Sequence, residues 1–316
     1  MLVTVLQRLI GAITVLVFVS VFVFLVIHLA PGDAAEIVAG DRASEEQLAA
    51  VREDLGLDDP LIVQFGRWAG GVLRGDLGDS LVSGRPVVDS LMSAAPATLS
   101  ITALAVAMSV VFGVTAGTLA GLKRGTVVDR VVTVVTSVAL AMPSFWVGML
   151  LVGAFALERS WFPATGYAPL SDGVGEWLQH IILPAVALAT ATIAEVARQT
   201  RGGVVDVMAR PYIRTARSKG VSGAALVRRH VLRNSAIPVV TVLGLQVGRL
   251  LGGVVVVEAV FGIPGLGTVG ISAVQRRDLP LLQGYILLVA TVVVVINTVV
   301  DLSYMWINPR TRTERA

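Results

Sequence analysis

The chain has 316 residues, of which 55% are hydrophobic and only 15% charged, and its mean hydropathy is +0.79. A soluble domain of that length needs far more charge to cover its surface, so the composition excludes a soluble globular protein and predicts an integral membrane protein. The absence of cysteine excludes disulfides and thiolate metal sites, and the net charge of +3 says less than the distribution of the charges.

Six stretches are long and apolar enough to cross a bilayer as helices, which takes about 20 residues each. Because backbone groups cannot stay unpaired in lipid, we expect helices and not open strands. A cleavable signal peptide is the alternative for the first stretch, but its apolar run exceeds the usual length of about 7–15 residues, and its removal would leave an odd number of spans. The six expected spans are 9–29, 97–121, 131–157, 177–197, 234–257 and 281–305.

The distribution of Lys and Arg gives the orientation of these spans. With the N-terminus in the cytoplasm, sixteen Lys and Arg fall in cytoplasmic segments and eight in outer segments. Five of those eight lie in the long loop 31–96, and long loops cross the membrane largely regardless of their charge. We therefore predict an all-α integral membrane protein with six transmembrane helices and both termini in the cytoplasm.

The outer loop 31–96 carries twelve acidic residues and is expected to be partly folded. Residues 44–47 (Ser-Glu-Glu-Gln) form a capping box that opens a helix, and Gly56 is placed to end it. A second short helix is expected over Leu61–Leu73. The loop is interpreted either as a solvated acidic cap or as a platform for an extracytoplasmic partner.

The segment 214–234 lies between two apolar stretches, concentrates positive charge and holds no acidic residue. One interpretation is a topology signal that keeps the loop in the cytoplasm and rests on anionic lipid headgroups. The other is a docking element for a cytoplasmic partner. Its six cationic residues are Arg214, Arg217, Lys219, Arg228, Arg229 and Arg233.

The same segment is patterned as two helices joined at a glycine. Ile213 and Ala216 are spaced to share one apolar helix face, and Gly220 supplies the turn that follows. Ser222 is placed to cap a second helix over 223–233. Small residues at the tip of such an elbow let another backbone approach closely.

From residue 214 the spacing resembles the ATPase-docking loop of ABC importer permeases of the dipeptide/oligopeptide and nickel family, whose pattern is E-A-A-x3-G-x9-I-x-L-P. Arg214-Thr215-Ala216, Gly220, His230 and Leu232 stand at the corresponding positions. Arg214 replaces the glutamate, and the R-T-A-x-x-K-G opening is similar to the peptide-permease branch. Further motifs that resemble this family, in its order, are Pro31-Gly32-Asp33, Leu55-Gly56-Leu57-Asp58, Gly75-Asp76-Leu77-Gly78, Pro264-Gly265-Leu266-Gly267, Asp278-Leu279-Pro280 and Pro309-Arg310.

The resemblance implies a bacterial inner-membrane permease with the type I ABC importer fold, which forms half of a path for di- or oligopeptides. It implies a second permease chain, two ATPase subunits that bring ATP and Mg, an extracytoplasmic substrate-binding protein, membrane lipids around the chain, and no nucleic acid. The first span would lie in 1–30, a helical outer domain in 31–96 and a five-helix core in 97–316, with a cytoplasmic coupling loop at 198–233. The implied coupling residues are Arg214, Thr215, Ala216, Arg217, Ser218, Lys219, Gly220 and His230.

Other functions stay open at this point. The family also carries nickel chelates, glutathione and haem-like ligands. A gradient-driven secondary transporter is less well supported, because only Glu195, Arg249 and Asp301 place charge near or within spans and no inverted repeat is apparent. The three histidines are scattered, which disfavours a membrane-embedded enzyme. The chain has no G-x-x-x-x-G-K-[ST] phosphate loop, so ATP hydrolysis is expected in partner subunits and no cofactor in this chain.

Residues near the fifth span are candidates for the translocation path and its outer gate. An arginine in mid-span costs about 2.5–3.5 kcal/mol on insertion scales, so Arg249 must face protein or water. It could meet a peptide carboxylate, or pair with Glu258 or Asp301. The stretch 261–267 has three glycines and a proline and cannot be regular helix, which fits a gate, a binding-protein contact or a re-entrant turn. The candidate residues are Arg249, Glu258, Phe261, Pro264 and Gly265.

Overall fold

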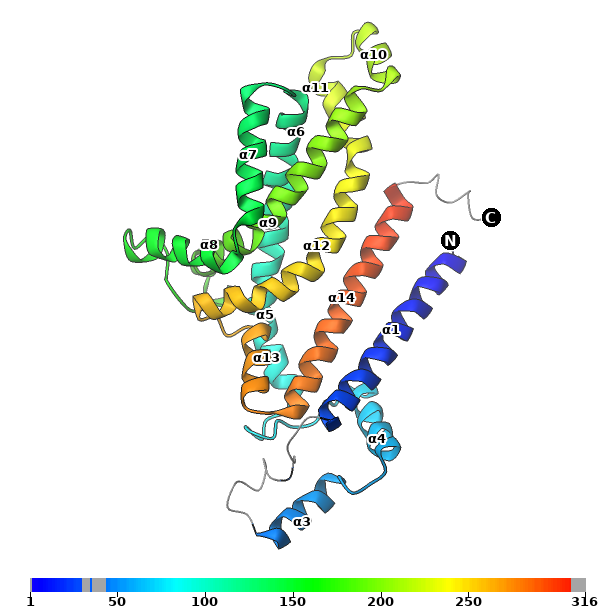
Figure 1. Cartoon of the computed structure of the whole chain (residues 1–316), viewed down its shortest axis with the longest axis vertical. Helices are drawn as coiled ribbons and strands as arrows, with labels where there is room; N and C mark the ends of the chain where they lie inside the picture. The colour runs from blue at the N-terminus through cyan, green and yellow to red at the C-terminus, as the bar shows by residue number, and fades with distance from the viewer. Residues whose placement is uncertain (1, 30–34, 36–43, 308–316) are drawn as a thin grey trace. The chain divides into compact units, whose positions relative to one another are not determined.

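The computed structural model of the chain describes residues 2–29, 35 and 44–307, and its named elements are helices (Figure 1). Three π-helical segments interrupt or extend them at Ser109–Gly113, Val152–Leu157 and Val227–Val231, and a 3-10 turn lies at Leu170–Asp172. The helices are α1 (Leu2–Leu29), α3 (Glu45–Leu55), α4 (Leu61–Leu73), α5 (Val87–Met108), α6 (Val114–Leu122), α7 (Val127–Ala141), α8 (Ser144–Leu151), α9 (Val174–Met208), α10 (Pro211–Ser218), α11 (Gly223–Leu226), α12 (Leu232–Phe261), α13 (Leu266–Gln275) and α14 (Leu279–Ile307).

In the described ranges, four helical stretches are long and apolar enough to cross a membrane by themselves, and two further candidates consist of two helices each. The number of spans is therefore four to six, and the upper value agrees with the predicted topology. The four continuous stretches are Leu6–Leu25, Val87–Leu122, Val174–Met208 and Leu279–Val300.

The expectation of one helix over 131–157 is wrong, because the chain bends by 103° between α7 and α8. Pro143 explains the bend. It has no amide hydrogen to continue the helical ladder, and its ring favours the extended conformation that Met142 adopts (φ −86°, ψ 124°). At about 1.5 Å per residue, α7 alone is shorter than the hydrocarbon core.

The second broken candidate is interrupted after Phe261, the last residue of α12. Gly262 ends that helix in the left-handed conformation (φ 57°), which a glycine adopts without steric cost. The expectation that 261–267 is not regular helix is confirmed for 262–265, whereas α13 already begins at Leu266.

The contacts within the chain divide it into two compact units. One comprises 99–263 together with 296–316, and the other comprises 2–98 together with 264–295.

In the first unit, α9 is the central helix and packs against α6, α7, α8 and α12. Figure 1 shows α6, α7 and α9 side by side. Gly113, Gly117 and Gly121 recur every four residues and let α9 come close: a Cβ on Gly117 would stand 2.3 Å from the carbonyl oxygen of Ala197. Small residues at this spacing are typical of close helix pairs in membranes.

The second unit is held together by an apolar cluster and a buried polar joint. Val87, Leu91 and Ala94 of α5 pack with Leu266 of α13. In the joint, buried Asp278 accepts hydrogen bonds from the Ser80 hydroxyl (2.5 Å) and from the Leu81 amide (3.2 Å).

Further contacts secure the ends of this second unit. The amide of Leu266 donates to the Thr98 hydroxyl (2.8 Å), so the start of α13 is held on α5. On α14, a Cβ on Gly284 would stand 2.5 Å from a methyl group of Val87, which requires a glycine at this crossing.

Two elements of the outer loop agree with their sequence predictions. The Ser44 hydroxyl accepts from the Gln47 amide (3.3 Å) and the Gln47 side chain accepts from the Ser44 amide (2.9 Å), so the capping box is confirmed. Gly56 ends α3 with φ 62°. The second helix, α4, has the predicted bounds.

Candidate coupling site

The segment between α9 and α12 forms the predicted elbow, with α10 on one side of Gly220 and α11 on the other. Pro211 occupies the first turn of α10, where its missing amide hydrogen costs nothing. Gly220 has φ 78°, and no atom would lie within 4 Å of a Cβ there. The turn therefore requires glycine for its backbone conformation, while the space around it is open to an approaching surface.

The second arm of the elbow starts as predicted but does not stop at Arg233. The Ser222 hydroxyl accepts from the Ala225 amide (3.4 Å) and caps α11. The helix then continues through the π-helical segment Val227–Val231 directly into α12. The backbone of this arm is thus continuous with a helix that carries candidate path residues.

The elbow is seated on the end of α9 by an apolar cluster, which we call the elbow core. Ile213 is fully buried among Val204 and Val207 of α9 and Leu226 and Val231 of the second arm. Met208, Ala216 and Val221 pack against this cluster and are partly buried. The apolar face predicted for α10 is confirmed, and it joins the two arms and their supporting helix.

The outer side of the elbow is cationic and accessible. Within the described part of the chain, the six cationic side chains of this segment form no ion pair with an acidic residue. Thr215 and Ser218 are also exposed, whereas Ala216 and His230 are half-buried. A surface of this kind attracts an acidic or phosphate-bearing partner. The six exposed cations are Arg214, Arg217, Lys219, Arg228, Arg229 and Arg233.

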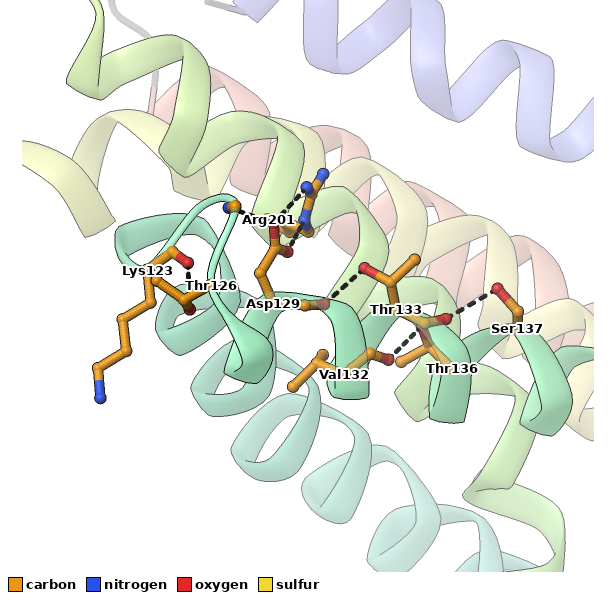
Figure 2. A network of polar contacts seen from close by, with 9 residues as sticks. Lys123, Thr126, Asp129, Val132, Thr133, Thr136, Ser137 and Arg201 are labelled. Carbon is orange, nitrogen blue, oxygen red and sulfur yellow. Dashed lines mark hydrogen bonds and ion pairs between the residues drawn. The ribbon is translucent and has the colours of Figure 1, made fainter.

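A second feature of the first unit, which the sequence analysis missed, is an ion pair between α7 and α9 (Figure 2). Asp129 accepts from Nε of Arg201 (2.5 Å) and from its second guanidinium nitrogen (2.9 Å), and from the amide of Gly125 (2.9 Å). Such two-point pairing fixes distance and orientation together. Arg201 lies two turns before the end of α9, so the pair ties the α6–α7 loop to the helix that carries the elbow.

The network continues along α7, as Figure 2 shows. The Thr126 hydroxyl donates to the carbonyl of Lys123 (2.6 Å) in the loop, and the Thr133 hydroxyl donates to the carbonyl of Asp129 (2.8 Å). These bonds satisfy polar side chains locally and leave the Asp129 carboxylate to Arg201 and Gly125.

In the first unit, three candidate path residues lie on α12 in different environments. Arg249 is exposed, while Glu258, nine residues further on, has no exposed surface. Phe261 is 2% exposed, and its carbonyl accepts from the amide of Gly166 (2.9 Å). A Cβ on Gly148 of α8 would stand 3.1 Å from the Phe261 ring, so this ring is packed tightly.

The remaining two candidates belong to the second unit. Pro264 is exposed, and Gly265 is buried just before α13. The structure therefore gathers the predicted coupling residues in one elbow, whereas the path candidates differ in burial and belong to two units.

Comparison with known proteins decides the family. The model of the family described as "Binding-protein-dependent transport system inner membrane component" matches residues 113–313. The model of the N-terminal part of such membrane components matches residues 1–102. The chain belongs to this family. It is thus a multi-pass inner-membrane permease of an ABC importer, a non-catalytic transport subunit, and it works with ATPase and substrate-binding partners.

Several relatives of the permease match along nearly their whole length. It is 41% identical over 308 residues to a protein of Sinorhizobium fredii named probable peptide ABC transporter permease, covering 98% of both chains. It is 44% identical over 308 residues to the glutathione transport system permease proteins of Escherichia coli K12 and Salmonella paratyphi A, again covering 98% of both chains.

A solved structure supports the fold of the permease. The inward-facing MetNI methionine ABC transporter is similar with a TM-score of 0.55 and 16% sequence identity, covering 69% of this chain and 96% of that chain. This likeness confirms the type I importer fold expected from the sequence.

Only part of the polar contacts near the end of α9 could be found from sequence patterns. The loop at 123–130 holds three cations and a single acid, Asp129, and this acid is its informative residue. A lone carboxylate inside a basic loop is a signal for a specific ion pair, although its partner 72 residues away cannot be read from spacing.

Proposed function

We propose that this permease imports di- or oligopeptides and forms half of the translocation path beside a second permease chain. Two ATPase subunits would bind the cytoplasmic side with Mg-ATP, and an extracytoplasmic binding protein would deliver the solute. The peptide class is supported by the names of the relatives, one a probable peptide permease and others glutathione permeases. Glutathione is itself a modified tripeptide, so both names point to short peptides.

The observation that carries the coupling proposal is the elbow with its buried base and exposed cationic tip. Ile213 and its apolar neighbours make the elbow stiff where it meets α9. The open, left-handed turn at Gly220 lets another backbone come close. The residues proposed to touch an ATPase subunit are Arg214, Thr215, Ala216, Arg217, Ser218, Lys219, Gly220 and His230.

In the proposed cycle, ATP binding closes the two ATPase subunits, and each pulls one permease elbow. The movement passes along α9 on one arm and through Val227–Val231 into α12 on the other. Rigid helices of this kind rock between inward-open and outward-open states. ATP and Mg act in the ATPase subunits, and this chain supplies the joint and the path.

For the path we propose Arg249 as a residue that meets a peptide carboxylate, since its side chain is exposed on α12. Glu258, Phe261, Pro264 and Gly265 are proposed to belong to the outer closure. Arg249→Gln should weaken uptake of peptides with a free carboxyl terminus, while Arg249→Lys should retain more of it. Equal uptake of all peptides by both variants would remove Arg249 from the path.

The test of the proposed function is uptake by the reconstituted complex. The permease, its second permease, the ATPase subunits and the binding protein are placed in proteoliposomes with labelled dipeptide, oligopeptide or glutathione. ATP-dependent uptake of a peptide, lost in Gly220→Glu, supports the proposal. Uptake of glutathione alone would favour the second candidate, glutathione import, which the 44% identical relatives support. Peptide uptake that continues without nucleotide would contradict both.

A further inference from the structure

Helix α4, in the outer loop, exposes more apolar surface than a water-facing helix would. None of its residues is buried, and Ile62 and Leu73 are 80% and 89% exposed. The neighbouring helix α3 is polar and starts with two glutamates, as expected for a helix in water. Large exposed aliphatic side chains on one helix mark a surface that something apolar covers.

The two faces of α4 are distinct. Ile62, Ala69 and Leu73 lie within about 40° of one another around the helix at 100° per residue, and we call them the aliphatic flank. Gln64 and Arg67 lie about 140–160° away from Ile62 on the same projection. The helix is therefore amphipathic, with one polar side and one apolar side.

The polar side is held by the preceding loop. The Gln64 side chain donates to the carbonyls of Leu57 (2.9 Å) and Asp59 (2.8 Å). Arg67 pairs with the Asp59 carboxylate at 2.6 Å. These bonds fix the rotation of α4, so the direction of the aliphatic flank is set and not free to vary.

An aromatic cluster fixes α4 to the outer end of α1. The Phe24 ring of α1 is 5.3 Å from the Phe65 ring and 5.9 Å from the Trp68 ring, measured between centroids. Phe24 is 4% exposed and stands next to the end of the apolar stretch Leu6–Leu25. Tryptophan at the end of a span is typical of the membrane–water interface, and Trp68 belongs to this cluster.

The apolar surface of α1 leads up to this cluster. Phe18 and Phe22 are 71% and 57% exposed along α1 and stack on each other, and Leu25 is 43% exposed. The aliphatic flank lies within two turns of Phe65 and Trp68 on α4. It therefore stands beside the end of an apolar stretch that is long enough to cross a membrane.

We propose that α4 is an interfacial helix whose aliphatic flank lies in the outer leaflet of the membrane. Ile62 and Leu73 contact acyl chains next to the headgroups, and Arg67 and Gln64 stay on the water side. Helices of this type insert their apolar face by about 5–10 Å. The outer loop is thus anchored to the lipid surface at α4, independently of which solute the permease carries.

Spin labels test this placement, because the chain has no cysteine of its own. Single variants Ile62→Cys and Leu73→Cys are labelled in the full importer, assembled with cysteine-free partner subunits in lipid nanodiscs. Arg67→Cys is the matched control on the polar side of α4, and Phe18→Cys is the control within the span. Collision rates are measured with oxygen, which concentrates in lipid, and with a water-soluble nickel chelate.

The expected result is a several-fold excess of oxygen over nickel collisions at 62 and 73, as at 18, and the reverse at 67. Collision depth at 62 and 73 should be shallow, within about 10 Å of the headgroups. Low collision rates with both reagents would mean that another protein chain covers the flank. High nickel collisions would mean that the flank faces water. Either of these two results would overturn the proposal.

Discussion

Replacing Ile213 by alanine should loosen the elbow from α9. Ile213 has no exposed surface and lies in the middle of the elbow core. The substitution removes three carbons, worth about 0.8 kcal/mol each in transfer from water, or about 2.4 kcal/mol together. The cavity left behind raises the cost toward the range of about 2–5 kcal/mol seen for such truncations. The elbow is a small surface unit, so this loss of stability should lower the free energy of local opening of the elbow and not the free energy of global unfolding.

Hydrogen exchange measures that opening directly. The amides of Gly220 and Val221 donate to the carbonyls of Arg217 (3.0 Å) and Ala216 (3.2 Å), and these bonds break when the elbow opens. A loss of about 1.4 kcal/mol raises the equilibrium constant for opening by a factor of ten. The loss of about 2.4 kcal/mol in Ile213→Ala should therefore speed exchange of these amides by about 50-fold or more. Transport should fall while membrane insertion stays normal.

Tyr212→Ala is the matched control for this experiment, because Tyr212 is adjacent in α10 but 44% exposed. It should leave exchange at both amides near the wild-type rate. Unchanged exchange and wild-type uptake in Ile213→Ala would refute the role of the elbow core as the stiff base of the joint.

Three further predictions concern the same unit. Asp129→Ala removes the acceptor that holds Arg201, so ATP hydrolysis by the assembled complex should persist while the amount of solute taken up per ATP falls. The control Glu195→Ala breaks an ion pair within α9 alone and should change the uptake per ATP little. Equal ratios in both variants would show that the α7–α9 pair does not transmit motion. Gly117→Val should push α6 away from the α9 backbone and lower the yield and melting temperature of the purified chain, and normal melting would contradict the close packing. Gly220→Glu should leave the protein in the membrane but abolish uptake, as measured in proteoliposomes, and wild-type uptake would remove the turn from the docking surface.

Local features of this fold were predictable because their causes lie within a few residues. The capping box at residues 44–47, the stop at Gly56 and the bounds of α4 all follow from short-range bonding and apolar spacing. The elbow at Gly220 was predictable for the same reason. Its turn needs a positive φ, and Ser222 supplies the next cap.

Long-range features were not predictable from periodicity. Val231 completes the elbow core from beyond the turn, and nothing in its sequence neighbourhood marks it. The bend at Pro143 was overlooked because the apolar run 131–157 is uninterrupted by charge, although the proline itself was a visible signal. Hydropathy reports where a chain is apolar, whereas the path of the backbone depends on single residues.

A crosslinking experiment tests most directly what touches the elbow. Ser218 is exposed at the tip, and the chain has no cysteine, so Ser218→Cys offers a single crosslinking site in the assembled importer. Asp172→Cys, exposed on a different loop, is the control. We expect a crosslink from position 218 to an ATPase subunit, with a yield that changes with ATP, and no crosslink from position 172. An elbow that forms no crosslink to any ATPase, in a complex that still transports without nucleotide, would contradict this expectation.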